Sequence, residues 1–184
     1  MFSIRKSSIP PNSLLHAYTT SGTYADAYST EVVGHISLSA FMFAFYTTPL
    51  FRLERFILSK TIAKPSTDSQ ARQLADGEID SFAAWRVEAR GEAEILLCDI
   101  SGRTRSWLLV VPVGGGDVSR TRLYFGSAVV PVRNPKTGQL SLGLVFQSLL
   151  RFHQMYSVLL LYSAKLRIKH GSHMTKRTRE FINE

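Results

Sequence analysis

The sequence predicts an α+β fold in which an antiparallel β-sheet meander packs on a long C-terminal α-helix. Three observations carry this prediction. Apolar and polar residues alternate over residues 82–132, which is the period of a strand. Apolar residues instead recur at helical spacing over residues 38–62 and again over residues 141–169. The chain has 184 residues, which suits one hydrophobic core, and we expect a single domain over residues 24–169.

The first 36 residues predict a flexible arm and one strand. Residues 1–23 are rich in Ser, Thr and Pro and hold only isolated apolar residues, so we expect a loosely held N-terminal arm. Strand-favouring residues with imperfect alternation then run from Tyr24 to Ile36. This second segment should form the first strand of the domain.

Two or three short helices should follow that strand. The hydroxyl of Ser37 or Ser39 can accept a backbone N–H and so begin the first helix. The pair Thr48-Pro49 ends it, because the residue before a proline is disfavoured in the α region. Proline is favourable in the first turn of a helix, so a second helix should begin here and extend to about Ile62.

A third helix and the meander come next. Residues 67–70 (Thr-Asp-Ser-Gln) fit a capping box, and the helix should end near Gly77. The pair Ser101-Gly102 suits a tight hairpin turn between two strands. The alternation predicts four strands in all, at Phe82–Arg90, Glu92–Ile100, Arg103–Val113 and Arg120–Val132.

The chain ends in a long helix and a basic tail. The helix should run from about Ser141 to Lys169, and its broad apolar face is interrupted by only a narrow polar stripe. We expect residues 170–184 to form a basic tail. Residues 171–174 (Gly-Ser-His-Met) match the remnant that cleavage of an affinity tag leaves, so part of this tail can be vector-derived. No function is inferred from residues 171–184.

The charge distribution argues against a nucleic-acid partner. Half of the formal net charge of +8 falls in residues 165–184, which hold six basic and two acidic residues. Residues 86–122 mix six arginines with five acidic residues, whereas a nucleic-acid groove needs a basic stripe interleaved with aromatic residues. Peripheral contact with a membrane fits better, through the basic end of the apolar last helix.

The sequence predicts a cytoplasmic protein that can associate with a membrane surface, with no cofactor and no metal. Cys98 is the only cysteine, so no disulfide can form within the chain, and its apolar neighbours predict a buried side chain. The N-terminal residues lack the apolar run of a secretory signal. No histidine has cysteine or acidic partners at the spacing of a metal site.

The order of elements resembles the helix-grip architecture of START-like and Bet v 1-like domains, the SRPBCC-type superfamily. In these domains a curved antiparallel sheet wraps a long C-terminal helix, and the resemblance covers residues 24–168. Residues 97–100 (Leu-Cys-Asp-Ile) and 150–153 (Leu-Arg-Phe-His) resemble short motifs of an uncharacterised bacterial family in this superfamily. The chain departs from the pattern in having about five predicted strands and a helical stretch within residues 63–80, so a cystatin-like or another helix-on-sheet fold stays open.

The resemblance implies a cavity between the sheet and the last helix that admits an apolar small molecule or a lipid. Aromatic side chains on the strands and on the last helix can line such a cavity or fill the core. Arg105 is a candidate for a polar contact at the cavity mouth. The candidate ligand-binding residues are Trp85, Arg105, Trp107, Tyr124, Phe152 and Tyr156.

The sequence holds two candidates for proton transfer but no catalytic motif. His153 lies among apolar residues of the last helix, and an imidazole titrates near neutral pH. Asp99 precedes a turn that leads to Arg103 and Arg105, where a surface ion pair is the simpler interpretation. The leading hypothesis is therefore non-catalytic binding of an apolar small molecule or lipid. The alternatives are a cyclase- or hydratase-like enzyme that uses His153 or Asp99, and a membrane-surface or protein-interaction module.

Overall fold

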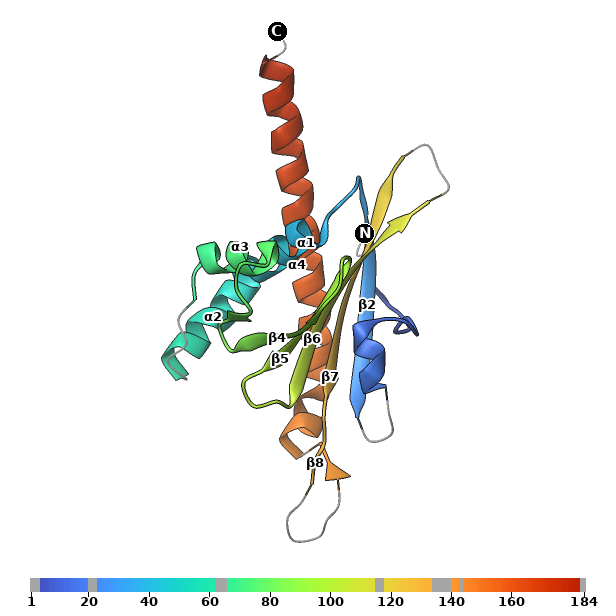
Figure 1. Cartoon of the computed structure of the whole chain (residues 1–184), viewed down its shortest axis with the longest axis vertical. Coiled ribbons are helices and arrows are strands. Elements are labelled where there is room, and N and C mark those ends of the chain that lie inside the picture. The colour runs from blue at the N-terminus through green and yellow to red at the C-terminus, as the bar shows by residue number, and fades with distance from the viewer. Residues whose placement is uncertain are drawn as a thin grey trace.

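The structure, a computed structural model, describes residues 4–19, 23–61, 66–114, 118–133, 140–142 and 144–182. Within these residues it has a seven-stranded antiparallel sheet, a separate two-stranded pair, four α-helices and one short 3₁₀ helix. The predicted α+β fold with a long C-terminal helix is confirmed. Figure 1 shows the sheet with its helices.

The main sheet has the strand order β1-β2-β7-β6-β5-β4-β3, and neighbouring strands are antiparallel. The predicted four-strand meander corresponds to strands β4 to β7, and each boundary lies within three residues of its expected place. The strands are β1 (Arg5–Lys6), β2 (Tyr24–Val33), β3 (Ser81–Phe82), β4 (Trp85–Arg90), β5 (Glu94–Asp99), β6 (Thr104–Val113) and β7 (Arg120–Val129), with β8 (Val132–Arg133) and β9 (Leu140–Ser141) forming the separate pair.

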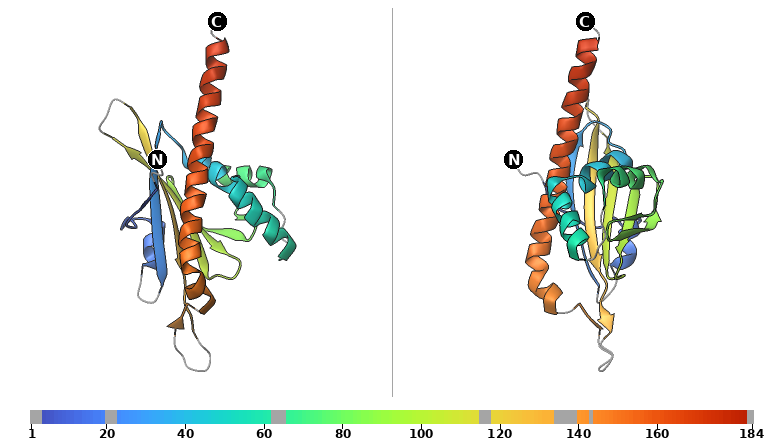
Figure 2. Two further views of the ribbon diagram at one scale, coloured as in Figure 1. Left: turned by 180° about the vertical axis from the view of Figure 1, so that it is seen from behind. Right: turned by 90° about the vertical axis from the view of Figure 1, so that its left-hand side faces the viewer.

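The helices lie on both faces of the sheet. Figure 2 shows α4 crossing one face, with η1 on the opposite face. We call these the helical face and the η1 face. The helices are η1 (Leu14–Tyr18), α1 (Leu38–Tyr46), α2 (Pro49–Thr61), α3 (Asp68–Asp76) and α4 (Leu144–Ile182).

Local signals in the sequence set the helix boundaries. The Ser37 side chain accepts a hydrogen bond from the backbone N–H of Ala40 at 3.2 Å, which begins α1. The predicted capping box begins α3, since Thr67 and Gln70 bond each other's backbone N–H groups. Gly77 then ends α3 with a φ of 82°, a conformation that favours glycine.

The ends of the chain differ from the sequence-based expectation. Residues 4–19 do not form a loose arm, because Arg5 and Lys6 pair with β2 and Leu15 is fully buried. Helix α4 begins three residues later than expected and continues to Ile182, through the segment predicted as a basic tail. Two-residue strands such as β1 and β3 leave no periodic signal, which explains why the sequence predicts only about five strands.

Two cores flank the sheet. The larger lies on the helical face, where α1, α3 and α4 cover the strands. The smaller lies on the η1 face and centres on Trp107 and Leu15, both fully buried. Cys98 is buried as predicted.

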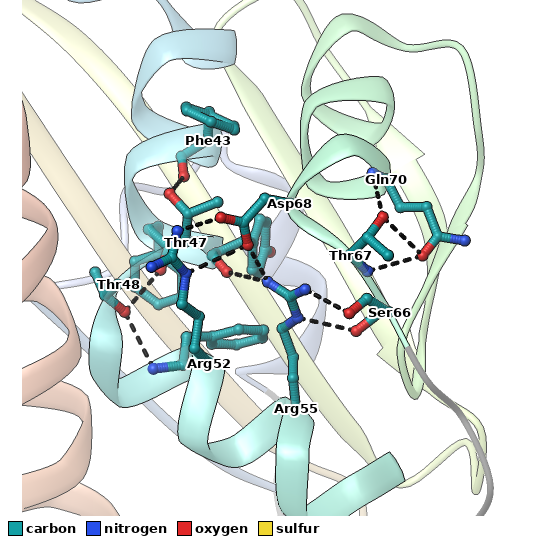
Figure 3. A network of polar contacts seen from close by, with 12 residues as sticks. Phe43, Thr47, Thr48, Arg52, Arg55, Ser66, Thr67, Asp68 and Gln70 are labelled. Atoms are coloured by element: carbon teal, nitrogen blue, oxygen red, sulfur yellow. Dashed lines mark hydrogen bonds and ion pairs between the residues drawn. The ribbon is translucent and has the colours of Figure 1, made fainter.

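Helix α2 is held to the start of α3 by a buried guanidinium. Arg55 is only 7% exposed, and its Nη1 lies 2.8 Å from the Asp68 carboxylate. Its Nε donates to the Ser66 hydroxyl at 2.9 Å, and Arg52 pairs with the same Asp68 (Figure 3). A buried charge is tolerated when it is paired and hydrogen-bonded. The network fixes α2, which forms one wall of the cavity described next.

Candidate ligand-binding cavity

A cavity of about 490 Å³ lies between α2, the first half of α4 and the helical face of the sheet. Strands β4, β6 and β7 form its floor, and Phe45 of α1 and Phe125 of β7 meet beside it with ring centroids 4.8 Å apart. Half of the described lining residues are aliphatic, Met or Phe. These apolar residues are Phe45, Leu50, Phe51, Leu53, Phe125, Phe152, Met155, Leu159 and Leu160.

The cavity mouth exposes large apolar side chains from two helices. Leu53 of α2 is 55% exposed, and Phe152 and Met155 of α4 are 58% and 54% exposed. Phe152 also stacks on Tyr156, with the two ring planes 13° apart. Large exposed apolar side chains that cluster around a pocket mark a binding or entry site more often than single ones do.

A hydrogen bond joins α2 to α4 across the cavity. The Tyr156 hydroxyl donates to the carboxyl group of Glu54. Burial raises the pKa of Glu54, although the Tyr156 hydrogen bond acts in the opposite direction. Burial and the adjacent carboxyl group also raise the pKa of Tyr156, so its hydroxyl stays protonated and can donate. These are polar groups placed among apolar ones, as in small-molecule sites.

A chain of hydrogen bonds at the cavity wall begins at a buried acid. The carboxylate of Asp26, on β2, is 2% exposed. Ser127 of β7 donates its hydroxyl to Asp26 Oδ1 at 2.7 Å, and His153 Nε2 of α4 lies 2.8 Å from the same Ser127 Oγ. Because the serine hydrogen is directed to the carboxylate, the imidazole nitrogen is the donor in the second bond. His153 and Ser127 line the cavity, and Asp26 stands behind them.

The same acid has a second donor. Tyr24 donates its hydroxyl to Asp26 Oδ2 at 2.7 Å, and the side-chain amide of Gln154 donates to Tyr24 at 3.1 Å. Burial lowers the pKa of His153, against the opposite effect of Asp26, whose carboxylate is 3.9 Å away. The imidazole is therefore uncharged near neutral pH. Satisfied buried networks of this kind hold their members in one geometry.

The structure brings several of the predicted site residues together. Trp85, Phe152, His153 and Tyr156 line the cavity, as does Arg105. The guanidinium of Arg105 does not serve it, however. It lies 3.0 Å from Glu88 and over the Tyr18 ring of η1, on the opposite face of the sheet.

Three predicted residues lie elsewhere. Trp107 and Tyr124 belong to the core of the η1 face, because successive residues of a strand point to opposite faces. Asp99 is not among the lining residues. Its carboxylate accepts the backbone N–H groups of Arg103 and Thr104, at 2.8 and 3.0 Å, and so holds the hairpin turn.

Sequence reasoning missed Asp26, Ser127 and Glu54. Asp26 begins a run of five buried residues in β2, and an acid at the start of such a run is a signal that could have identified it. Glu54 follows Leu50 by four residues, so the helical period places it on the same face of α2 as a lining residue. Nothing in the local sequence singles out Ser127, because its role depends on strand register.

Two further observations concern metals and membranes. Among the described residues, no three His, Cys, Asp or Glu side chains come together as a metal site requires. Nor does any helix in the described ranges combine the length and apolar character needed to span a bilayer.

Comparisons with known proteins add little to this geometry. No protein-family model matches the chain, and no curated protein sequence matches it either. Among solved structures it is similar to the crystal structure of TTHA0849 from Thermus thermophilus. That similarity covers 81% of this chain and 99% of the other at 12% identity, with a TM-score of 0.26. Function is therefore argued from the cavity alone.

Proposed function

We propose that the protein binds an apolar small molecule or a lipid in the cavity between α2, α4 and the sheet, without catalysing a reaction on it. The observation that carries the proposal is the cavity itself, with its volume of about 490 Å³ and its largely apolar lining. Small-molecule sites usually have volumes of roughly 300–1,000 Å³ and a few placed polar groups. This cavity fits both criteria.

The apolar mouth supports the same proposal. Leu53, Phe152 and Met155 would lose water-exposed apolar surface if a ligand occupied the opening between α2 and α4. Removing such surface from water is favourable by roughly 25 cal/mol per Å². An apolar occupant would therefore gain free energy from the mouth as well as from the interior.

The order of the polar groups supports binding rather than nucleophilic catalysis. In a hydrolase triad the imidazole stands between serine and acid and takes the serine proton. Here Ser127 stands between His153 and Asp26, and it donates its proton to the acid. The cyclase- or hydratase-like alternative keeps His153 as its proton-transfer group, while Asp99 lies outside the cavity lining.

The test is a titration with the uncharged fluorescent probe N-phenylnaphthylamine, whose emission rises in apolar surroundings. The wild type should bind it saturably. Ser106 lies on the cavity floor and is 7% exposed, so Ser106→Phe should fill the space and abolish the signal. Saturable binding that is equal in the wild type and in a folded Ser106→Phe variant would place the probe elsewhere and refute the proposal, as would no binding by the wild type.

A matched pair on α4 tests the mouth. Phe152→Ala should weaken probe binding about tenfold, because the probe would cover the exposed part of this ring and a loss of about 1.4 kcal/mol is a factor of ten. Leu166 is exposed on the same helix but does not line the cavity, so Leu166→Ala should leave binding unchanged. Both positions are exposed, and circular dichroism should show both variants folded. Equal losses in the two variants would contradict the assignment of the mouth.

A further inference from the structure

The charged groups of the cavity suggest which ligands it accepts. Among the described lining residues, three are acidic or basic, namely Glu54, Arg105 and His153. Apolar ligands in biology often carry one polar end, and the local charges decide whether that end can be an anion. Whether the cavity can hold an anion therefore depends on where each of these three side chains points and on what it binds.

Arg105 cannot pair with an anion in the cavity. Its Nη2 and Nε lie 3.0 and 3.1 Å from Glu88 Oε2, and its guanidinium lies 4.6 Å from the centroid of the Tyr18 ring. Both partners belong to the η1 face. Its strand neighbour Ser106 points to the helical face instead, as the alternation of a strand requires.

His153 does not supply a positive charge either. Burial keeps its imidazole neutral near neutral pH by lowering its pKa. Its Nε2–H donates to the Ser127 hydroxyl, which in turn donates to the Asp26 carboxylate behind the cavity wall. Any charge that a ligand senses here is the negative charge of Asp26.

Glu54 of α2 adds a second carboxyl group. It lines the cavity, and it accepts a hydrogen bond from the uncharged hydroxyl of Tyr156. Arg52 and Arg55 of α2 both bind Asp68 and neither lines the cavity. One acid, Glu54, thus lines the site and a second, Asp26, stands behind its wall, and none of the described lining residues directs a cation at it.

From this arrangement we infer that the cavity takes ligands whose polar end is an uncharged hydrogen-bonding group, such as the hydroxyl of a long-chain alcohol, and rejects carboxylates of the same length. The inference rests on the proposed function and sharpens it. A hydroxyl can donate to Glu54 or accept from a wall donor. A carboxylate would enter a partly dehydrated space beside the Glu54 carboxyl group and in front of the buried Asp26, and juxtaposition of like charges is strongly unfavourable.

The experiment is a displacement titration at neutral pH. Wild-type protein loaded with N-phenylnaphthylamine is titrated with decanol and, separately, with decanoate. Decanol should displace the probe at a concentration at least about tenfold lower than decanoate. Displacement by decanoate at an equal or lower concentration overturns the inference but leaves the proposed function intact. Failure of the probe to bind at all would overturn both.

Variants separate the charge effect from the general preference of apolar sites for neutral molecules. Glu54→Gln keeps the size and the acceptor for Tyr156 but removes the charge, and it should reduce the decanol-to-decanoate ratio several-fold. Asp26→Asn should do the same if it folds. A ratio unchanged in Glu54→Gln, and unchanged in folded Asp26→Asn, would show that the acids do not select the ligand and would overturn the inference.

Discussion

The two faces of the sheet differ in how completely they are filled. On the η1 face a helix of five residues lies directly on the strands, and Leu15 and Trp107 are fully buried. On the helical face a much longer helix leaves a cavity of about 490 Å³ beside it. Both faces are rich in aromatic residues. The number of aromatic side chains therefore does not decide between core and pocket, whereas the fit of the covering element does.

Close approach is possible on the η1 face because Gly126 has no side chain. A Cβ at this position would lie 2.6 Å from Leu15 Cδ2 and 2.8 Å from Trp107 Cε3. The indole N–H of Trp107 donates to Glu94 at 2.6 Å, and Glu94 also accepts the backbone N–H of Leu14. Packing and polar satisfaction both hold η1 in place.

Helix α4 has one side buried against the sheet and another side exposed beside the cavity. Leu161 and Ala164 are fully buried, and Lys165 donates to Thr30 of β2 at 2.8 Å. About two to three turns earlier, Phe152 and Met155 are more than half exposed. His153 in these earlier turns still hydrogen-bonds Ser127 of β7, and the cavity lies beside it, between α4, α2 and the strands.

The largest expected effect separates the two tryptophans. Trp107→Ala should lower the free energy of unfolding by about 3–5 kcal/mol, because it empties a closed core. Trp85→Ala should cost less, since Trp85 is only partly buried and borders the cavity, but it should weaken probe binding. Urea unfolding followed by circular dichroism measures the first effect and probe titration the second.

The opposite pattern would break the comparison between the faces. If Trp107→Ala, under conditions where it is folded, lost the probe while Trp85→Ala kept it, the roles assigned to the two faces would be wrong.

The next largest expected effect concerns Gly126, where η1 packs closely on the sheet. Gly126→Ala introduces a methyl group where there is no room, and it should cost about 1–3 kcal/mol. Gly114 has no heavy atom within 4 Å of an added Cβ, so Gly114→Ala serves as the matched control and should be neutral or slightly stabilising. Equal unfolding midpoints in urea for the two variants would contradict the close approach of η1.

The sequence predicts the fold well wherever local chemistry determines it. The capping box at Thr67, the glycine end of α3 and the alternation of β4 to β7 are all set by neighbouring residues, and all are found. The N-terminal segment is different. Leu15 belongs to a short apolar pair in a segment rich in Ser, Thr and Pro, and its burial depends on Gly126, more than a hundred residues later.

The site is only partly predictable from the sequence, because some of its contacts also join residues that are far apart in the chain. Residue type identifies His153, Tyr156, Phe152 and Trp85, which do line the cavity. The same reasoning places Trp107 at the site, but the alternation of side chains along β6 directs Trp107 to the η1 face. Register also brings Ser127 opposite Asp26, and neither residue carries a sequence signal strong enough to predict that contact.

The smallest expected effect concerns the carboxyl group that faces the cavity. Burial raises the pKa of Glu54 in the folded protein above its ordinary value. The folded state therefore holds this proton more tightly than the unfolded state, and stability falls as pH rises through the raised pKa. Glu54→Gln stays neutral throughout. It should match the wild type in acid and exceed it in thermal stability at neutral and alkaline pH.

The measurement is the difference in Tm between Glu54→Gln and the wild type across this pH range, by differential scanning calorimetry. Glu78 is exposed after α3, and Glu78→Gln controls for the loss of one negative charge from the surface. A Glu54→Gln difference that stays constant with pH would mean that Glu54 is as well solvated in the folded state as in the unfolded one. The helical face would then be open to water at this wall, and the contrast with the closed η1 face would become sharper still.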